Sequence, residues 1–470
     1  MPTRLLGVGA AAPSLRLAAA DVGAAGGRRA GRGRTGVCAP DEDTLTLAWD
    51  AATAALRAAA LEPHQVDGLW WGTARPPFAE GPSHAVLAAA LGCAPASGGA
   101  LLAGSTHAGA EALLGAADAV AAGSARYALV VASDALVPGT GGPAEPRTGA
   151  GAAAVVLAAE GGTASVVARI TRTRPHLDRH RGDGERVTRD VYDPRLFRDV
   201  VFLPAVTEVA SALASFDVRA WSLPDPDGRL GATVASSLGL PAPASAGVYA
   251  EIGDTGAAAA LLGAIGSLDV EGVVAIVATG GGRTTGVTID VETPVPGAAL
   301  VAEALTGGRP VTYTEALRAR GALVAAGETV PMGVPPESAM FVRGAHEMLG
   351  LRGGRCVDCG TISTPPSIHP TCIACGAAKL EDVAIARTGT IHTFVVNQTM
   401  PAPFVAPLPI GVLDLDDGAR LMLQVVGDGS DLAIGTRVDL VLRRYAHERG
   451  VPVYGFKARP MRRAQEVGRS

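Results

Sequence analysis

The chain of 470 residues is 48% hydrophobic and 18% charged, with a net charge of −5 at pH 7 and a pI near 6.0. These values are typical of a globular protein of two or three domains, and they argue against binding to nucleic acid or to an anionic membrane surface. We find no apolar run long enough to cross a bilayer and no signal peptide at the N-terminus. We therefore expect a cytoplasmic protein with no membrane partner.

The first 170 residues alternate short β-like runs with alanine-rich helical stretches. We predict helices over residues 45–60 and 108–122, and strands over 66–72 and 127–133. A polar stretch, 171–195, precedes a second alternating region, 202–291, in which strands are predicted at 247–252 and 273–279. The pattern predicts an α/β domain over residues 1–325, with two halves at about 1–170 and 171–325.

Proline and glycine residues interrupt the pattern after residue 291 and again at 331–336, which predicts a domain boundary between about 320 and 340. A helix is predicted at 341–349, and a cysteine cluster follows it in an expected segment 335–380. Short β-rich runs separated by Gly and Asp turns then predict a small barrel over 381–463. These runs are 389–397, 410–415, 420–426, 437–444 and 453–458.

Four of the six cysteines form two C-x2-C pairs with twelve residues between them: Cys356, Cys359, Cys372 and Cys375. Four thiolates at this spacing fit a tetrahedral zinc ion with no open position, so the site should be structural. Unmetallated thiols and a rubredoxin-like iron site are the alternatives. Cys38 and Cys93 lie far apart and are expected to be inert.

The C-terminal part contains the sequences Gly353–Gly360, Pro365–Pro366, Gly389–Ile391 and Ile434–Val438. They resemble the zinc-ribbon and OB-fold modules associated with acyl-CoA and thiolase enzymes. The resemblance implies a module that bridges subunits or channels acyl thioesters beside a thiolase-fold protein. OB barrels also bind single-stranded nucleic acid, but few aromatic residues and a cluster of Asp414, Asp416 and Asp417 argue against that here.

The N-terminal part contains seven sequences in a familiar order: Asp41–Ala48, Gly72–Ala79, Thr106–Leu113, Tyr192–Phe197, Leu223–Asp225, Ile252–Gly256 and Gly280–Gly282. Together they resemble the thiolase superfamily, and most of all the archaeal-type 3-hydroxy-3-methylglutaryl-CoA (HMG-CoA) synthases and their ketosynthase III relatives. The resemblance implies a thiolase-like fold, an acyl-CoA or acyl-carrier-protein thioester as ligand, and a homodimer.

The functional positions of that family are altered in this chain. Thr106 stands where the C-x-A-G-T motif of the family has its nucleophilic cysteine, and Ser222 stands at the position of the catalytic histidine. Asp254 replaces the asparagine of I-G-N-T, and Ala74 replaces the glutamate of G-S-E-S. A threonine hydroxyl titrates far above neutral pH and needs a positioned base, which Ser222 cannot supply.

Asp254 is our candidate proton carrier, because a carboxylate buried against an apolar pocket could take a proton from a carbon next to a thioester. A structural, hydrogen-bonded carboxylate is the alternative for Asp254. His107 is a further candidate base, with a capping or packing role as its alternative. We expect His84 to be structural and Glu111 to be solvated or to lie between subunits.

Two functions remain open. The first is an enzyme that acts on acyl thioesters without an acyl-cysteine, for example in aldol, retro-aldol or cyclisation chemistry. The second is a non-catalytic pseudoenzyme that supports an active ketosynthase, thiolase or carrier protein. The chemistry of the altered residues argues against a standard synthase or ketosynthase.

Overall fold

The computed structural model of the protein describes residues 3–27, 31–189, 193–323, 344–400, 404, 406–448 and 451–461. The chain divides into two units, Met1–Ala325 and Ala326–Ser470.

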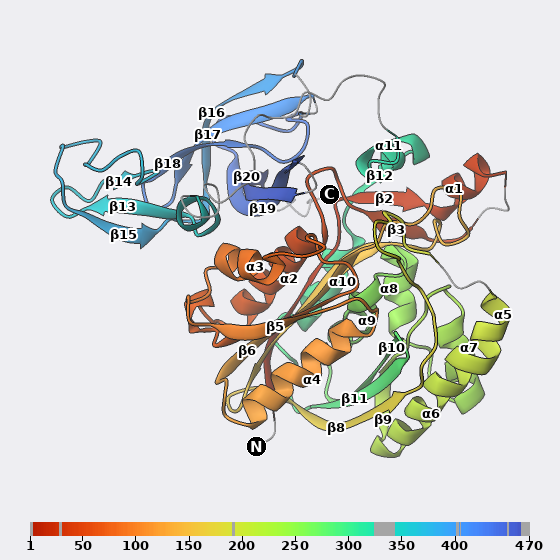
Figure 1. Ribbon diagram of the computed structural model, residues 1–470. Coiled ribbons are helices and arrows are strands. Elements are labelled where there is room, and N and C mark those ends of the chain that lie inside the picture. The colour runs from red at the N-terminus through yellow and green to blue at the C-terminus, as the bar shows by residue number, and fades with distance from the viewer. Residues whose placement is uncertain are drawn as a thin grey trace, which may run out of the picture. The chain divides into compact units, whose positions relative to one another are not determined.

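The first unit is built on a nine-stranded sheet with the strand order β5-β4-β6-β7-β1-β8-β11-β10-β9 (Figure 1). Its strands are β1 (Arg4–Ala11), β4 (Gly68–Thr73), β5 (Gly98–Ala103), β6 (Tyr127–Ala135), β7 (Ala150–Ala158), β8 (Ala164–Thr173), β9 (Val218–Ser222), β10 (Gly272–Gly280) and β11 (Arg283–Val291). β4 pairs in parallel with β5 and β6, and β9 pairs in parallel with β10. The remaining pairs are antiparallel. Strands β1 and β4–β7 form one half, and β8–β11 form the other.

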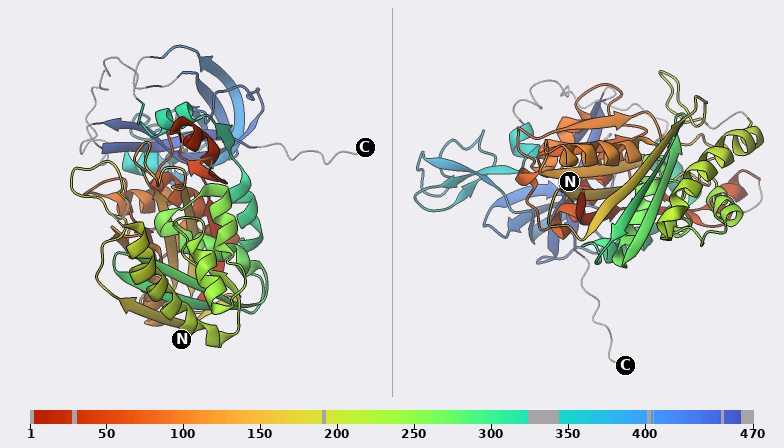
Figure 2. Two further views of the ribbon diagram at one scale, coloured as in Figure 1. Left: turned by 90° about the vertical axis from the view of Figure 1, so that its right-hand side faces the viewer. Right: turned by 90° about the horizontal axis from the view of Figure 1, so that it is seen from below.

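Helices cover both faces of this sheet. α4 (Ala108–Ala121) and α9 (Ala259–Ile265) share one hydrophobic core with β6, β7, β10 and β11. α2 (Thr44–Ala58) packs on β1, β6 and β7. α6 (Leu203–Leu213) packs on β8, β10 and β11, and Figure 2 shows α6 and α7 (Leu230–Leu238) on one side of these strands. This layered arrangement confirms the predicted α/β fold.

Local sequence explains why α2 begins at Thr44. The carboxylate of Asp43 accepts hydrogen bonds from the backbone N–H groups of Leu45 and Thr46, and the Thr46 hydroxyl in turn accepts one from the Asp43 N–H. This reciprocal cap satisfies donors that the first turn of a helix leaves without partners.

The strand predicted at 247–252 is wrong, because this segment belongs to the helix α8 (Ser245–Ile252). Val248 and Ile252 lie four residues apart and both pack on the main core, as residues on one helix face do. The apolar residues at 248, 250 and 252 occupy alternate positions, which is the two-residue repeat expected of a strand. The helix ends at Gly253, whose φ of 77° suits glycine.

One helical stretch, Pro194–Phe216, is long and apolar enough to cross a membrane by length and composition, which the sequence analysis did not expect. It consists of α5 (Pro194–Leu196), a π-helical turn (Phe197–Phe202), α6 and a final short turn. Phe202, Val206 and Leu213 are buried in the core against the sheet. A helix that covers a sheet passes the same length and composition test.

The other elements of the first unit are a small sheet and several short helices. A small sheet has the order β12-β2-β3, and α1 and α11 contact its β2 strand. The bounds are β2 (Leu15–Ala18), β3 (Arg34–Val37), β12 (Arg309–Val311), α1 (Ala19–Ala25), α3 (Ser83–Leu91), α10 (Val301–Thr306) and α11 (Tyr313–Ala319).

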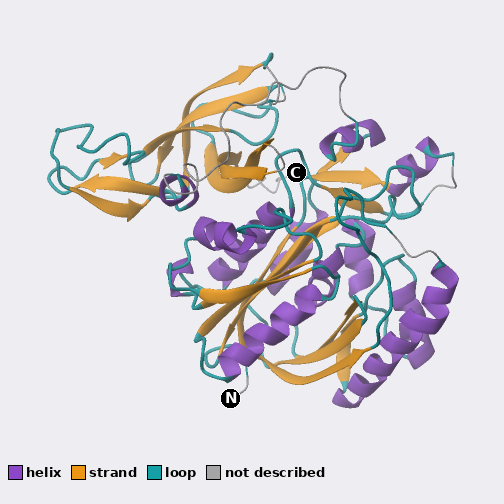
Figure 3. Ribbon diagram, in the orientation of Figure 1, coloured by secondary structure: helices purple, strands orange, loops and turns teal. Residues whose placement is uncertain are grey.

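The described residues of the second unit form almost entirely strands and loops (Figure 3). A three-stranded ribbon contains β13 (Arg352–Cys356), β14 (Ile362–Ser363) and β15 (Leu380–Ala384). A five-stranded sheet follows in the order β18-β17-β16-β19-β20, with β16 (Thr388–Asn397), β17 (Leu408–Leu415), β18 (Arg420–Gln424), β19 (Arg437–Glu448) and β20 (Val451–Pro460). A bridge from Val425 to Ala458 links the two ends of this sheet, so it is nearly a closed barrel.

The regular helix predicted at 341–349 is not found in the described residues. Residues 341–343 lie outside the described part of the chain, and Ala345–Leu349 form a single π-helical turn rather than a regular helix.

Candidate functional site

A pocket of about 300 Å³ opens in the first unit. Its walls come from segments far apart in sequence: the start of α4, the 143–147 loop, the polar stretch after β8, the helix that begins at Pro194, the loop before α7, the turn after α8, α9 and the end of β10. Apolar side chains such as Phe197, Phe202 and Leu230 line it together with several aspartates and arginines. A volume of this size is at the lower end of the range of about 300–1,000 Å³ for ligand pockets, so it suits a short chemical group.

Thr106 lines the pocket just before the first turn of α4. Its Oγ1 donates a hydrogen bond to the carbonyl oxygen of Thr279, at 3.0 Å. Gly280, with a φ of 157°, passes so close that a Cβ there would overlap Thr106 Oγ1. The hydroxyl thus lies in a close-fitting backbone cradle at a helix N-terminus, but the structure brings no histidine or carboxylate to within hydrogen-bond distance of it among the described residues.

Asp254 also lines the pocket, in the turn after α8. Its side chain is only 8% exposed, and its Oδ2 lies 2.6 Å from the Arg179 Nη1 in an ion pair. Its Oδ1 accepts a hydrogen bond from the Gly256 N–H at 3.0 Å. The ion pair and the backbone hydrogen bond fix the orientation of this carboxylate in the pocket wall.

Ser222 and His107 do not line the pocket. The Ser222 hydroxyl is fully buried and donates to the carbonyl oxygen of Ala260 at 2.8 Å, which directs it into α9. The His107 ring is buried with 1% exposure. Its Nε2 lies 2.8 Å from Thr285 Oγ1 and its Nδ1 3.4 Å from Glu111 Oε1. Burial lowers the pKa of His107, so the neutral ring is favoured.

Sequence reasoning missed Arg179, because no pattern around a single arginine in a polar stretch indicates which residue it pairs with. It also missed Asp134, which is fully buried on β6. Asp134 accepts hydrogen bonds from Thr73 Oγ1 at 2.8 Å and from the backbone N–H groups of Ala74 at 3.0 Å and Ala257 at 2.7 Å. It thereby ties the segment at Ala74 to the turn that leads into α9. An aspartate inside the apolar run 127–135 was the available signal.

Asp225 is the third residue that sequence reasoning did not select. It lines the pocket from the loop before α7, and its Oδ1 accepts a hydrogen bond from the Leu230 N–H at 3.1 Å. Burial, with a smaller effect of the nearby Asp227 carboxylate, raises the pKa of Asp225 to about 6. The resemblance placed Asp225 in a motif, but its environment could not be read from that motif.

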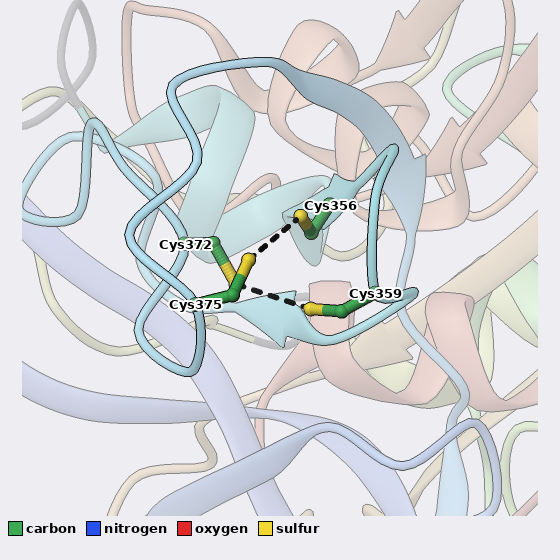
Figure 4. A group of neighbouring side chains, drawn as sticks. All are labelled: Cys356, Cys359, Cys372 and Cys375. Atoms are coloured by element: carbon green, nitrogen blue, oxygen red, sulfur yellow. Dashed lines mark hydrogen bonds between the residues drawn. The ribbon is translucent and has the colours of Figure 1, made fainter.

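The four cysteines converge in the ribbon of the second unit, and Figure 4 shows their sulfur atoms pointing toward one another. The four Sγ atoms all lie within 4.8 Å of one another, with 3.6 Å between Cys356 and Cys375 and 3.5 Å between Cys359 and Cys372. Tetrahedral zinc–thiolate bonds of about 2.3 Å require sulfur–sulfur distances of about 3.8 Å. The residues therefore fit a zinc ion.

Comparisons with known proteins agree with this architecture. The family model of the ChsH2 C-terminal OB-fold domain matches residues 382–443, which confirms the predicted OB fold. A DUF35 domain-containing scaffold protein of Methanothermobacter thermautotrophicus is 35% identical over 130 residues, which are 26% of this chain and 96% of that protein. This chain belongs to the DUF35 domain family. The OB-fold match lies in the second unit, which we call the DUF35 unit from here on.

The thiolase-like fold is confirmed as well. A hydroxymethylglutaryl-CoA synthase of Thermococcus sibiricus is 31% identical over 215 residues, covering 43% of this chain and 59% of that protein. The match thus spans little more than half of that relative. A solved HMG-CoA synthase structure superimposes with a TM-score of 0.62 at 17% identity, covering 72% of this chain and 95% of that one. The 3-oxoacyl-(acyl carrier protein) synthase III of Pseudomonas aeruginosa gives a TM-score of 0.56 at 22% identity, covering 63% and 99%.

The DUF35 unit and the pocket therefore have separate chemical characters. The cysteine cluster of the DUF35 unit offers four ligands and no open position, so it fits a structural role. Thr106 and Asp254, the predicted site residues that line this pocket, both lie in the first unit.

Proposed function

We propose that the first unit binds acyl thioesters, of CoA or of a carrier protein, in this pocket and acts on them without an acyl-cysteine intermediate. The observation that carries the proposal is Thr106, which lies in the pocket at the start of α4, where an acyl-accepting thiol would need to be. Solved relatives with this fold include an HMG-CoA synthase complexed with CoA and another in complex with 3-hydroxy-3-methylglutaryl-CoA. Their fold supports the choice of ligand class.

Chemistry that needs no nucleophile includes removal of a proton next to a thioester carbonyl, and cleavage or formation of the adjacent carbon–carbon bond. Arg179 and Asp254 provide a fixed charge pair in the pocket that can orient a polar acyl group. In this proposal Thr106 and Asp254 contact the acyl group, whereas His107 and Ser222 hold the surrounding structure.

The second candidate is a non-catalytic partner of an active ketosynthase, thiolase or carrier protein. It is favoured by Ser222, whose hydroxyl is committed to α9, and by a relative named as a scaffold protein. In this case the DUF35 unit, with one zinc ion in its cysteine cluster, would contact the partner.

The test combines binding with intact mass. The full-length protein should bind acetyl-CoA in isothermal titration calorimetry and should show no added acyl mass after incubation. Absence of binding to any short acyl-CoA or acyl carrier protein would refute the proposal, and so would an acyl adduct mapped to Thr106. Binding without conversion of any tested thioester would favour the non-catalytic role.

A further inference from the structure

Three aspartates besides Asp254 line the pocket, and their contacts differ. Asp178 accepts a hydrogen bond from the Gly281 N–H at 2.9 Å, which joins the stretch after β8 to the β10–β11 turn. Asp227 accepts hydrogen bonds from the N–H groups of Arg229 at 2.9 Å and Leu230 at 3.0 Å. Asp225 shares the Leu230 donor with Asp227.

The start of α7 does not depend on Asp225 alone. Leu230 is the first residue of α7, and its N–H is already within hydrogen-bond distance of Asp227. A second carboxylate at the same donor adds little to the cap and places two negative charges near each other. Keeping an acidic residue there costs free energy, so its position in the pocket wall calls for a chemical explanation.

Ion pairing distinguishes Asp225 from Asp254. Asp254 lies 2.6 Å from Arg179 in an ion pair, so one of its carboxylate oxygens is already occupied. Asp225 has no ion pair with a described residue, and the pocket that it lines also has the apolar side chains of Phe202 and Leu230 in its wall. Such surroundings favour the protonated carboxyl group and make the carboxylate a better base.

We propose that Asp225, rather than Asp254, is the catalytic base that takes the α-proton of an acyl thioester bound in the pocket. This inference rests on the proposed function. In the step, the α-carbon–hydrogen bond breaks and its electron pair forms the enolate, whose negative charge resides on the thioester oxygen. The proton forms an O–H bond on Asp225. In D2O the Asp225 proton exchanges with solvent, and the reverse step places deuterium on the carbon.

The charged and titratable side chains around Asp225 come from its own loop, from α8, from the helix that begins at Pro194, and from the remaining pocket wall: Asp227, Tyr249, Arg195, Arg198, Arg147, Arg179, Asp178 and Asp254. Asp227 is the one that raises the pKa of Asp225 beyond the effect of burial. The carboxylate form is the base, so α-proton exchange should increase with pH and level off above about pH 6.

The experiment follows deuterium incorporation into acetyl-CoA and propionyl-CoA in D2O by mass spectrometry, with the full-length protein. The wild type should exchange the α-protons above the spontaneous rate. Asp225→Asn should lose at least about 100-fold of this rate while it still binds the thioester, since general-base catalysis contributes about 10²–10⁴-fold. Asp227→Asn is the matched variant, because it alters the same helix start and keeps an acceptor oxygen there.

The Asp227→Asn protein should retain exchange, with the midpoint of its pH profile moved to lower pH because a like charge has been removed. Thermal unfolding of both variants separates loss of the fold from loss of the base. Exchange that survives in Asp225→Asn would overturn the assignment of Asp225 but not the proposed function. The same holds if the wild type binds a thioester and does not exchange its α-protons. A wild type that binds no thioester would refute the proposed function itself.

Discussion

At the scale of single residues, Thr106 lies in the pocket wall just before the first turn of α4. Its hydroxyl is held by the Thr279 carbonyl and lies in a cradle closed by Gly280. The acyl-cysteine route needs a thiolate, a base that maintains it and donors for the oxyanion. Ser222 and Ala74 supply neither the base nor a general acid.

Replacement of Thr106 by cysteine should therefore not create synthase activity. We expect Thr106→Cys to react with iodoacetamide slowly, because no histidine is within reach to favour its thiolate. Acyl transfer from acetyl-CoA, measured by intact mass, should stay below detection. Rapid acylation of this variant would show that some other group in the pocket activates position 106.

Asp134 leads to a prediction about stability and pH. Burial raises the pKa of Asp134 to about 6 from 3.8. Between these values the unfolded chain releases the proton while the folded protein keeps it, so the contribution of Asp134 to stability falls as pH rises through this window. The contribution of Asp134 to the free energy of unfolding is constant above about pH 6. The total change is about 3 kcal/mol for a shift of about two pKa units.

Asp134→Asn removes this titration. The free energy of unfolding of Asp134→Asn minus that of the wild type should rise by up to about 3 kcal/mol between pH 4 and pH 7, as measured by urea unfolding. The sign of the difference at any one pH also includes the lost hydrogen bonds to Thr73 and Ala257. A difference that does not change with pH would contradict a raised pKa.

The candidate site shows what the sequence can and cannot predict. Motif positions led to Thr106 and Asp254, and both line the pocket. The roles of Asp225 and Arg179 depend on which side chains meet across the pocket, and no local pattern encodes that. The sequence also could not indicate the ion pair of Asp254, because its partner Arg179 lies 75 positions away.

At the scale of elements, the ribbon of the DUF35 unit depends on its cysteines. Within β13, β14 and β15, Cys356 and Ile362 are the only buried hydrophobic side chains. Metal binding must therefore supply much of the stability of this ribbon, on the order of 10 kcal/mol in small zinc domains. We expect about one zinc per chain by metal analysis. Cys356→Ser or Cys375→Ser should lose the metal and increase amide exchange across β13–β15. Cys93→Ser serves as control, and a well-folded ribbon without metal would contradict the assignment.

The start of α4 yields another prediction at this scale. A Cβ on Gly109 would overlap the carbonyl oxygen of Ala257, so Gly109→Ala must push α4 away from the turn before α9. We expect a loss of about 1–3 kcal/mol in urea unfolding. Gly247→Ala in α8 is the matched control, because nothing lies within 4 Å of its Cβ and alanine favours a helix. Equal losses of stability in Gly109→Ala and Gly247→Ala would contradict the close approach of α4 to Ala257.

Element prediction succeeded for the long helices and for most of the predicted strands, and it failed for the short helix α8. The helices α2 and α4 extend over 15 and 14 residues, which is long enough for a helical period to be recognised. The segment of α8 is eight residues long, and its alternating apolar residues matched a strand as well as a helix. Only its packing against the core decided between the two.

At the scale of the whole molecule, the order of strands leaves β5 at one edge of the nine-stranded sheet. Its sequence, Gly-Gly-Ala-Leu-Leu-Ala, carries no charge and no proline that would protect an open edge. We predict a homodimer in which β5 pairs across a two-fold axis. Light scattering should give twice the chain mass at micromolar concentration, and amides of residues 98–103 should exchange more slowly as concentration rises. A stable monomer would contradict the prediction.

The cradle around Thr106 has a consequence for protein engineering. Its geometry comes from backbone contacts: α4 lies against β4 at Gly72 and against the turn before α9 at Gly109, and Gly280 closes over the hydroxyl. The contacts at Gly72 and Gly109 are with backbone oxygens, and only the contact at Gly280 reaches the Thr106 hydroxyl. The reactivity of the pocket can therefore be redesigned by exchanging side chains while the main chain stays in place, which makes this unit a practical scaffold for installing new catalytic groups.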